Sequence, residues 1–175
     1  MSNRREYPYV GPSDLLDNLP VNSGRALVQS GADVINWLTE TNQPREYDGS
    51  VIATFIIDAD GQLWINDRRS EHVRCASGQN VLSAGEITFE LNQTSVEVID
   101  VTNQSTGYCP EVTSWWAVQQ ALEMANIIHP SDFTMKIIFR LCDHCGVKNI
   151  VKDDWFECGV CQSPLTEEWN FDQNN

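Results

Sequence analysis

The feature that most constrains this chain is a set of four cysteines near its C-terminal end. They form two Cys-x-x-Cys pairs, Cys142 with Cys145 and Cys158 with Cys161, and twelve residues separate the pairs. Each pair aims two sulfur atoms at one point, and a hairpin between the pairs brings the two turns together. Zinc takes four thiolates at about 2.3 Å in a tetrahedron. The spacing therefore predicts one structural Zn²⁺ ion.

Three alternatives remain open for these cysteines: two disulfides, free thiols, or a redox-active Cys-x-x-Cys motif. His144 offers a further ligand, but it lies inside the first turn and we expect it on the surface. Gly146 and Gly159 are expected to let the backbone bend tightly around the metal. Four thiolates leave no open coordination position, which argues against catalysis by this ion.

The residues between the two pairs have the pattern of a β-hairpin. Lys148–Lys152 and Trp155–Glu157 flank a predicted turn at Asp153 and Asp154. With its four cysteines, this segment resembles the zinc ribbon family over about residues 139–165. The resemblance implies a structural metal and frequent use as a docking surface for protein or nucleic acid. We expect residues 169–171 to fold back over the hairpin.

The residues before the ribbon predict an α+β fold with a mostly antiparallel sheet. Apolar, β-branched stretches bounded by turn residues are typical of strands; the predicted strands are 51–57, 63–66, 85–91, 95–101 and 134–141. A short helix, capped by Ser30 or Asp33, ends near Glu40. The main helix spans about 113–126, and its apolar stripe packs on the sheet; the stripe is Trp115, Val118, Ala121, Leu122 and Ala125. Trp37, Trp64 and Trp155 are expected in the core.

These patterns divide the chain into an α+β domain at 1–138, a zinc ribbon at 139–171 and a disordered tail at 172–175. Eleven Lys and Arg against 25 Asp and Glu give a net charge of −14. That charge argues against binding to nucleic acid or anionic membrane, and residues 139–175 carry three basic and seven acidic residues. With no apolar run of 18 residues and no secretory signal pattern, we expect a cytoplasmic protein.

Two central polar segments, 68–75 and 103–110, form a second candidate site. Their order resembles, weakly and over residues 70–122, a region of plant IQ-motif calmodulin-binding proteins and of uncharacterised bacterial proteins. The matching residues are His72, Ala84, Gly85, Ser105, Tyr108 and Pro110. Where that pattern has Gly and His, this chain has Thr106 and Gly107. The resemblance implies no defined biochemical role.

The candidate catalytic residues of these segments are His72, Glu71, Tyr108 and Cys109. His72 has the chemistry of a general base, Glu71 or an arginine that of a substrate ligand, and Cys109 that of a nucleophile. The alternative is structural: His72 ties two loops together and Cys109 is a small buried side chain. Two functions follow. The favoured one is a cytosolic adaptor that binds another protein, with a regulatory adaptor as one form of it. The other is a small enzyme whose site lies between the His72 and Tyr108–Cys109 loops.

Overall fold

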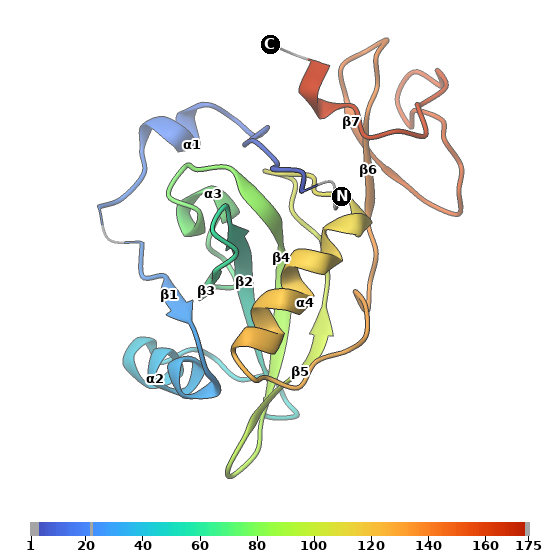
Figure 1. Ribbon diagram of the computed structural model, residues 1–175. Coiled ribbons are helices and arrows are strands. Elements are labelled where there is room, and N and C mark those ends of the chain that lie inside the picture. Colours follow the sequence, from blue (N-terminus) through green and yellow to red (C-terminus); the bar gives the residue numbers. More distant parts are fainter. Residues whose placement is uncertain (1–3, 22, 174–175) are drawn as a thin grey trace. The chain divides into compact units, whose positions relative to one another are not determined.

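The chain folds into two compact units, Met1–Lys136 and Ile137–Asn175. The structure is a computed structural model, which describes residues 4–21 and 23–173 (Figure 1). The N-terminal unit holds a five-stranded sheet and its helices, and the C-terminal unit holds a two-stranded sheet and the four cysteines. The predicted α+β fold with a mostly antiparallel sheet is therefore confirmed.

Every strand pairing in the larger sheet is antiparallel, and the strand order is β1-β3-β2-β4-β5. The strands are β1 (Ala26–Val28), β2 (Val51–Asp58), β3 (Leu63–Asp67), β4 (Val81–Leu91) and β5 (Val96–Val101). The short edge strand β1 was not predicted, because three residues are too few for a recognisable alternating pattern. Strand β4 begins at Val81, four residues before the predicted start, where it pairs with Tyr7 through two backbone hydrogen bonds.

The turn between β2 and β3 shows how local chemistry sets the register of the sheet. Gly61 has φ +82°, a conformation that glycine adopts without steric cost. One carboxylate oxygen of Asp58 accepts hydrogen bonds from the backbone N–H groups of Asp60 and Gln62. The other accepts one from Nε1 of Trp64 at 2.8 Å. Trp64 is half-buried and does not belong to the main core, so its predicted place there is wrong. Cζ of Arg25 lies 4.0 Å from the centroid of its ring.

Two helices pack on one face of this sheet. Helix α2 (Gly31–Thr41) begins with a capping box in which Ser30 and Asp33 each bind the other's backbone N–H. Helix α4 (Trp115–Met124) follows a 3₁₀ turn, η1 (Val112–Ser114). The predicted apolar stripe of α4 is buried, and with side chains of α2 and all five strands it forms the main core.

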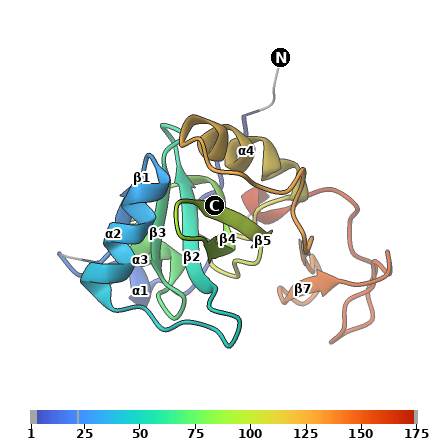
Figure 2. The ribbon, with the colours of Figure 1, turned by 90° about the horizontal axis from the view of Figure 1, so that it is seen from below.

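The opposite face of the sheet is covered by shorter elements. Helix α3 (His72–Cys75), in a segment predicted as a loop, contacts β2 and β3. Thr54 of β2 donates its hydroxyl to the carbonyl oxygens of Arg68 and Ser70, which lead into α3. Figure 2 shows α4 on one side of the strands and both α3 and α1 (Asp14–Asp17) on the other. The central strands are therefore buried on both faces.

The C-terminal unit is built on β6 (Ile138–Leu141), which pairs antiparallel with β7 (Lys148–Val151). Residues 134–137 of the predicted strand lie outside β6. The turn prediction at Asp153 and Asp154 is confirmed, because both residues have positive φ and the N–H of Trp155 reaches the carbonyl of Lys152 at 2.9 Å. Trp155 itself is 69% exposed, so its predicted place in the core is wrong.

The chain ends in a 3₁₀ turn, η2 (Phe171–Gln173). Two residues of the predicted disordered tail, Asp172 and Gln173, belong to this turn, and residues 174–175 lie outside the described residues. Trp169, Asn170 and Phe171 are all buried.

Candidate metal centre

The two Cys-x-x-Cys turns adopt the same backbone geometry. In the first, the N–H of Gly146 bonds the carbonyl of Cys142 at 2.8 Å; in the second, Gln162 bonds that of Cys158 at 2.9 Å. The fourth residue after the leading cysteine has positive φ in both turns, 74° for Gly146 and 63° for Gln162. In each turn the N–H of the leading cysteine also donates to the carbonyl of the residue five positions later, which is Val147 in the first turn and Ser163 in the second, at 2.9 Å. The site is therefore two copies of one turn that face each other.

This arrangement brings the four sulfur atoms together. All four Sγ atoms lie within 4.8 Å of one another, and none of the cysteines is in a disulfide. Sγ of Cys142 lies 3.6 Å from that of Cys161, and Sγ of Cys145 lies 3.6 Å from that of Cys158. A disulfide has an S–S distance of about 2.05 Å, whereas sulfurs at about 2.3 Å from one tetrahedral ion lie roughly 3.8 Å apart. The cluster fits a tetrahedral metal ion.

Electrostatics favour a cation at the same point. Backbone N–H groups of Cys161 and Val160 stabilise the Cys158 thiolate and lower the pKa of Cys158 to about 6. The hydroxyl and N–H of Ser163 lower the pKa of Cys161. At Cys145 the N–H of Val147 also favours the thiolate, but desolvation and the three other thiols outweigh it and raise the pKa to about 12. The cluster thus favours some thiolates and resists complete ionisation unless a positive charge is added.

Asn149 connects the two turns and was not singled out from the sequence. Its Oδ1 accepts a hydrogen bond from the N–H of Gly159 at 3.0 Å, and its Nδ2 donates to the carbonyl of Val147 at 3.0 Å. Nδ2 also lies 3.6 Å from Sγ of Cys158. Asn149 occupies the inward face of β7, with Val151 two residues on. The only sequence signal for it is its place on the strand face that carries Val151.

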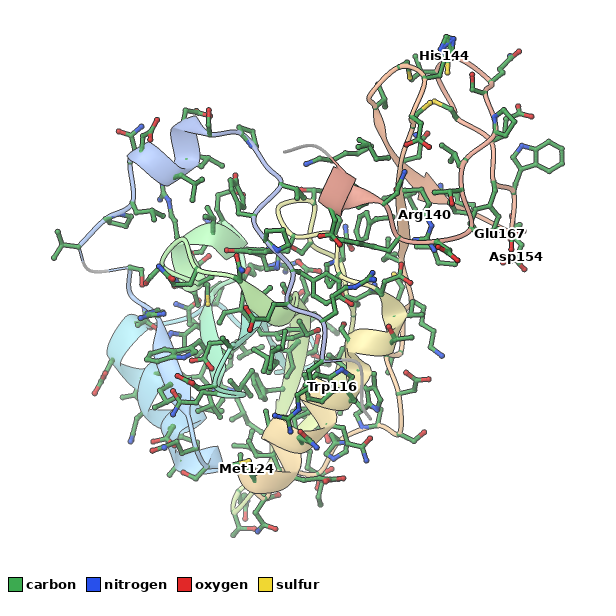
Figure 3. The ribbon with its side chains drawn as sticks, turned by 45° about the horizontal axis from the view of Figure 1, so that its top comes forward. Trp116, Met124, Arg140, His144, Asp154 and Glu167 are labelled. Atoms are coloured by element: carbon green, nitrogen blue, oxygen red, sulfur yellow. The ribbon has the colours of Figure 1, made fainter. Side chains whose placement is uncertain are left out.

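A second set of contacts closes the unit from the C-terminal side. Asn170 accepts from the N–H of Leu141 at 2.9 Å and donates to its carbonyl at 2.7 Å, as a neighbouring strand would. Buried Arg140 donates to the carbonyl of Glu167 at 2.6 Å, and Figure 3 shows its side chain directed toward that segment. Residues 169–171 therefore fold back onto β6, whereas the prediction placed them over a hairpin of 148–152 and 155–157. That hairpin is itself wrong, because β7 pairs with β6 and residues 155–157 form no strand.

Two details of the predicted site have clear outcomes. His144 is exposed and does not belong to the sulfur cluster, as expected (Figure 3). The role assigned to Gly159 is wrong, because the positive φ of the second turn falls on Gln162. A Cβ on Gly159 would meet nothing closer than Oδ1 of Asn149 at 3.9 Å. The bend in the second turn is therefore imposed by the turn's hydrogen bonds and not by a glycine.

The second candidate site consists of side chains that are bonded to the backbone. Nε2 of His72 lies 2.9 Å from the carbonyl oxygen of Gly85. Since a carbonyl oxygen only accepts, Nε2 carries the hydrogen, and burial lowers the pKa of His72 although this bond opposes the shift. Tyr108 is fully buried, its hydroxyl donates to the carbonyl of Gln79 at 2.8 Å, and burial raises its pKa.

Gly85 in β4 allows the chain around Thr102 to lie close beside this strand, to which His72 is also bonded. A Cβ at this position would lie 1.8 Å from the carbonyl oxygen of Thr102, so only glycine fits the close approach of the two backbones. Asn103, the next residue, donates Nδ2 to the carbonyl of Pro110 at 2.9 Å. The residues of the weak resemblance are thus parts of one buried scaffold. Their contacts favour the structural interpretation.

Cys109 and Glu71 complete the list of catalytic candidates. Cys109 is fully buried with φ 45°, and its Sγ lies 3.5 Å from the carbonyl of Thr106. Glu71 is exposed at the start of α3. A catalytic role for His72, Glu71, Tyr108 and Cys109 stays a prediction from the sequence.

In comparisons with known proteins, no family model, no curated protein and no solved structure matches the chain. Within residues 4–21 and 23–173, none of the helices has the length and apolar character needed to cross a membrane.

Proposed function

We propose that the four cysteines hold one Zn²⁺ ion whose role is structural, and that the protein is an adaptor that binds another protein. The observation that carries the first half is the cluster of four Sγ atoms within 4.8 Å. Thiolates in this number and arrangement suit zinc, and Cys142, Cys145, Cys158 and Cys161 would fill all four positions. The ion would cross-link the two turns and supply no open site for substrate.

The second half is supported by what the C-terminal unit leaves exposed. Trp155 and Val160 are each 69% exposed, and Ile150 is also exposed. Exposed aromatic and aliphatic side chains on a rigid support are typical of protein-binding surfaces. The acidity of the unit, three basic against seven acidic residues, disfavours phosphate backbones. The enzyme alternative gains no support, because His72 and Tyr108 are bonded to backbone carbonyls.

Metal analysis and chelation test the zinc proposal. The full chain, purified without chelator, is expected to contain one equivalent of zinc, and removal of the metal is expected to abolish the amide dispersion of residues 137–175 in NMR spectra. Restoring Zn²⁺ restores the spectrum, whereas Mg²⁺ does not. A chain that keeps a folded C-terminal unit without any metal contradicts the proposal.

Capture from the native host tests the adaptor proposal. The zinc-loaded chain is compared with Trp155→Ser and with Tyr47→Ser, which removes a still more exposed aromatic ring from the N-terminal unit. We expect the same host proteins to be captured by the wild-type chain and by Tyr47→Ser, and we expect Trp155→Ser not to capture them. Retention of nucleic acid in place of protein, or equal capture by all three chains, contradicts the proposal.

A further inference from the structure

A groove on the N-terminal unit lies between α2, the β4–β5 turn and the segment after α4. Its volume is about 650 Å³. We name it the α2–α4 groove; it is lined by residues 30–32, Ile35, residues 94–96 and residues 125–128. Figure 1 shows α2, the end of α4 and the β4–β5 turn at the same end of the sheet. A smaller hollow of about 250 Å³ adjoins it, since Ala125 lines both.

The groove exposes more apolar surface than a solvated connection between helices requires. Met124 on the last turn of α4 is 83% exposed, Ile128 is 65% exposed and Ile35 is 46% exposed (Figure 3 labels Met124). Ile35 and Ile128 line the groove, and Met124 lines the smaller hollow. Long apolar side chains that flank a groove are the usual anchors for an amphipathic segment of a partner.

The segments that line the groove carry charge of one sign. Residues 26–44 and 75–135, which supply all of its lining, contain no lysine or arginine. The same two stretches contain nine acidic residues, of which Asp132 pairs with Lys136. Asp33, Glu97 and Glu123 lie within two residues of the lining in sequence, and we call these three the acidic rim. Asp60 lines the adjoining hollow and is exposed. One cation lies close by: Arg45 lines another hollow, which shares Ile35 with the groove, and its guanidinium donates to the carbonyl of Gly49.

These observations select the occupant. A second copy of this chain carries the same net charge of −14, so the acidic rim opposes self-association. Nucleic acid and anionic membrane are repelled for the same reason. A peptide segment with apolar side chains on one face and Lys or Arg on the other matches both the exposed apolar residues and the acidic rim.

We propose that the α2–α4 groove binds a basic amphipathic segment of a partner protein. Apolar side chains of that segment contact Ile35, Met124 and Ile128, and its cations lie against the acidic rim. Electrostatic attraction accelerates association, and the apolar contacts fix the position of the segment. The inference rests on the proposed protein-binding role but not on the metal, because the groove belongs entirely to the N-terminal unit.

Binding of a designed probe tests this proposal with the full, zinc-loaded chain. The probe is a fluorescent 18-residue amphipathic peptide of Leu and Lys, and a Leu and Glu peptide of the same pattern serves as the negative probe. We expect saturable binding of the Lys peptide only, weakened by added salt. Amide shifts on binding are expected at residues 30–35 and 124–128. Zinc content measured in each sample separates failure here from failure of the metal proposal.

Variants make the test specific to the groove. The double change Met124→Lys with Ile128→Lys is expected to weaken binding at least about tenfold, since it removes two apolar contacts and adds two repulsive charges. Both side chains are exposed, so the fold is retained. Tyr47→Lys adds a charge at another exposed site and is the matched control, with an expected change below about twofold.

Three outcomes overturn the proposal. The first is no binding of the Lys peptide, and the second is equal weakening by the groove variant and by Tyr47→Lys, which marks attraction to net charge alone. The third is a dimer of the free chain in light scattering that Met124→Lys with Ile128→Lys dissociates, which assigns the groove to a second copy. If any of these outcomes occurs and capture of a partner still depends on Trp155, the groove proposal is overturned but the adaptor proposal is not.

Discussion

The two units of this protein are held together by different means. The N-terminal unit has a core to which α2, α4 and all five strands contribute. The buried cluster of the C-terminal unit is small, and among Cys142, Val151, Cys158 and Leu165 two members are the cysteines themselves. A unit of about forty residues rarely stabilises itself by apolar burial alone. The proposed metal would therefore take the place of a large hydrophobic core in the C-terminal unit, whereas the N-terminal unit has such a core of its own.

The largest expected effect comes from removing one thiolate. Cys158→Ser is expected to abolish stoichiometric zinc binding and to unfold residues 137–175, because structural zinc contributes about 10–16 kcal/mol in small domains. The N-terminal unit is expected to keep its native NMR spectrum. His144→Ala, an exposed change inside the other turn, is the control and should retain full metal content. Unfolding of both units in Cys158→Ser would contradict the conclusion that the two units are stabilised by different means.

The next effect is specific to the N-terminal unit. Gly85→Ala places a Cβ where the carbonyl oxygen of Thr102 lies only 1.8 Å away, so the two backbones must separate. We expect a loss of about 3 kcal/mol in the free energy of unfolding, measured by urea titration, with unchanged zinc content. Gly31→Ala is the matched control, because its Cβ would make an ordinary contact at 3.4 Å with Val96. An equally large loss for both variants would contradict the close-approach argument.

A smaller effect is expected at the residue that connects the two cysteine turns. Asn149→Ala removes the hydrogen bonds to Gly159 and Val147 without removing a ligand. Zinc affinity, measured by competition with a chromogenic chelator, is expected to fall by about 10–100-fold, the range for groups that support metal ligands. Gly159→Ala should change affinity little, since its Cβ has room. An unchanged zinc affinity in Asn149→Ala would show that the two cysteine turns keep their positions without Asn149.

The smallest effect concerns pH and the buried histidine. Burial lowers the pKa of His72 in the folded chain, whereas an unfolded histidine titrates near 6.5. The unfolded state therefore binds a proton first as the pH falls, and stability is lost below about pH 6.5 and regained above it. Urea unfolding of the N-terminal unit at pH 7.5 and 5.5 should show this loss, and His72→Asn should show less of it. An increase in stability on acidification would contradict the assigned environment.

Much of the N-terminal fold could be predicted because it depends on local patterns. The β2–β3 hairpin follows from an apolar run and an Asp-Gly turn, and α4 follows from its apolar stripe. The start of β4 and the strand β1 were missed, since both depend on pairing with distant segments such as Tyr7 and Ile65. Helix α3 was missed because four residues give no periodic signal.

The sequence by itself determined which atoms can meet a metal, because Cys-x-x-Cys spacing fixes where two sulfurs point. It also determined the acidic balance and the hydrophobic periodicity of the main elements. Only the tertiary structure decided that Gln162 takes the left-handed conformation, that Asn149 connects the turns and that Trp155 faces solvent. These outcomes depend on contacts between residues far apart in the chain, and such contacts leave no trace in local propensity or spacing.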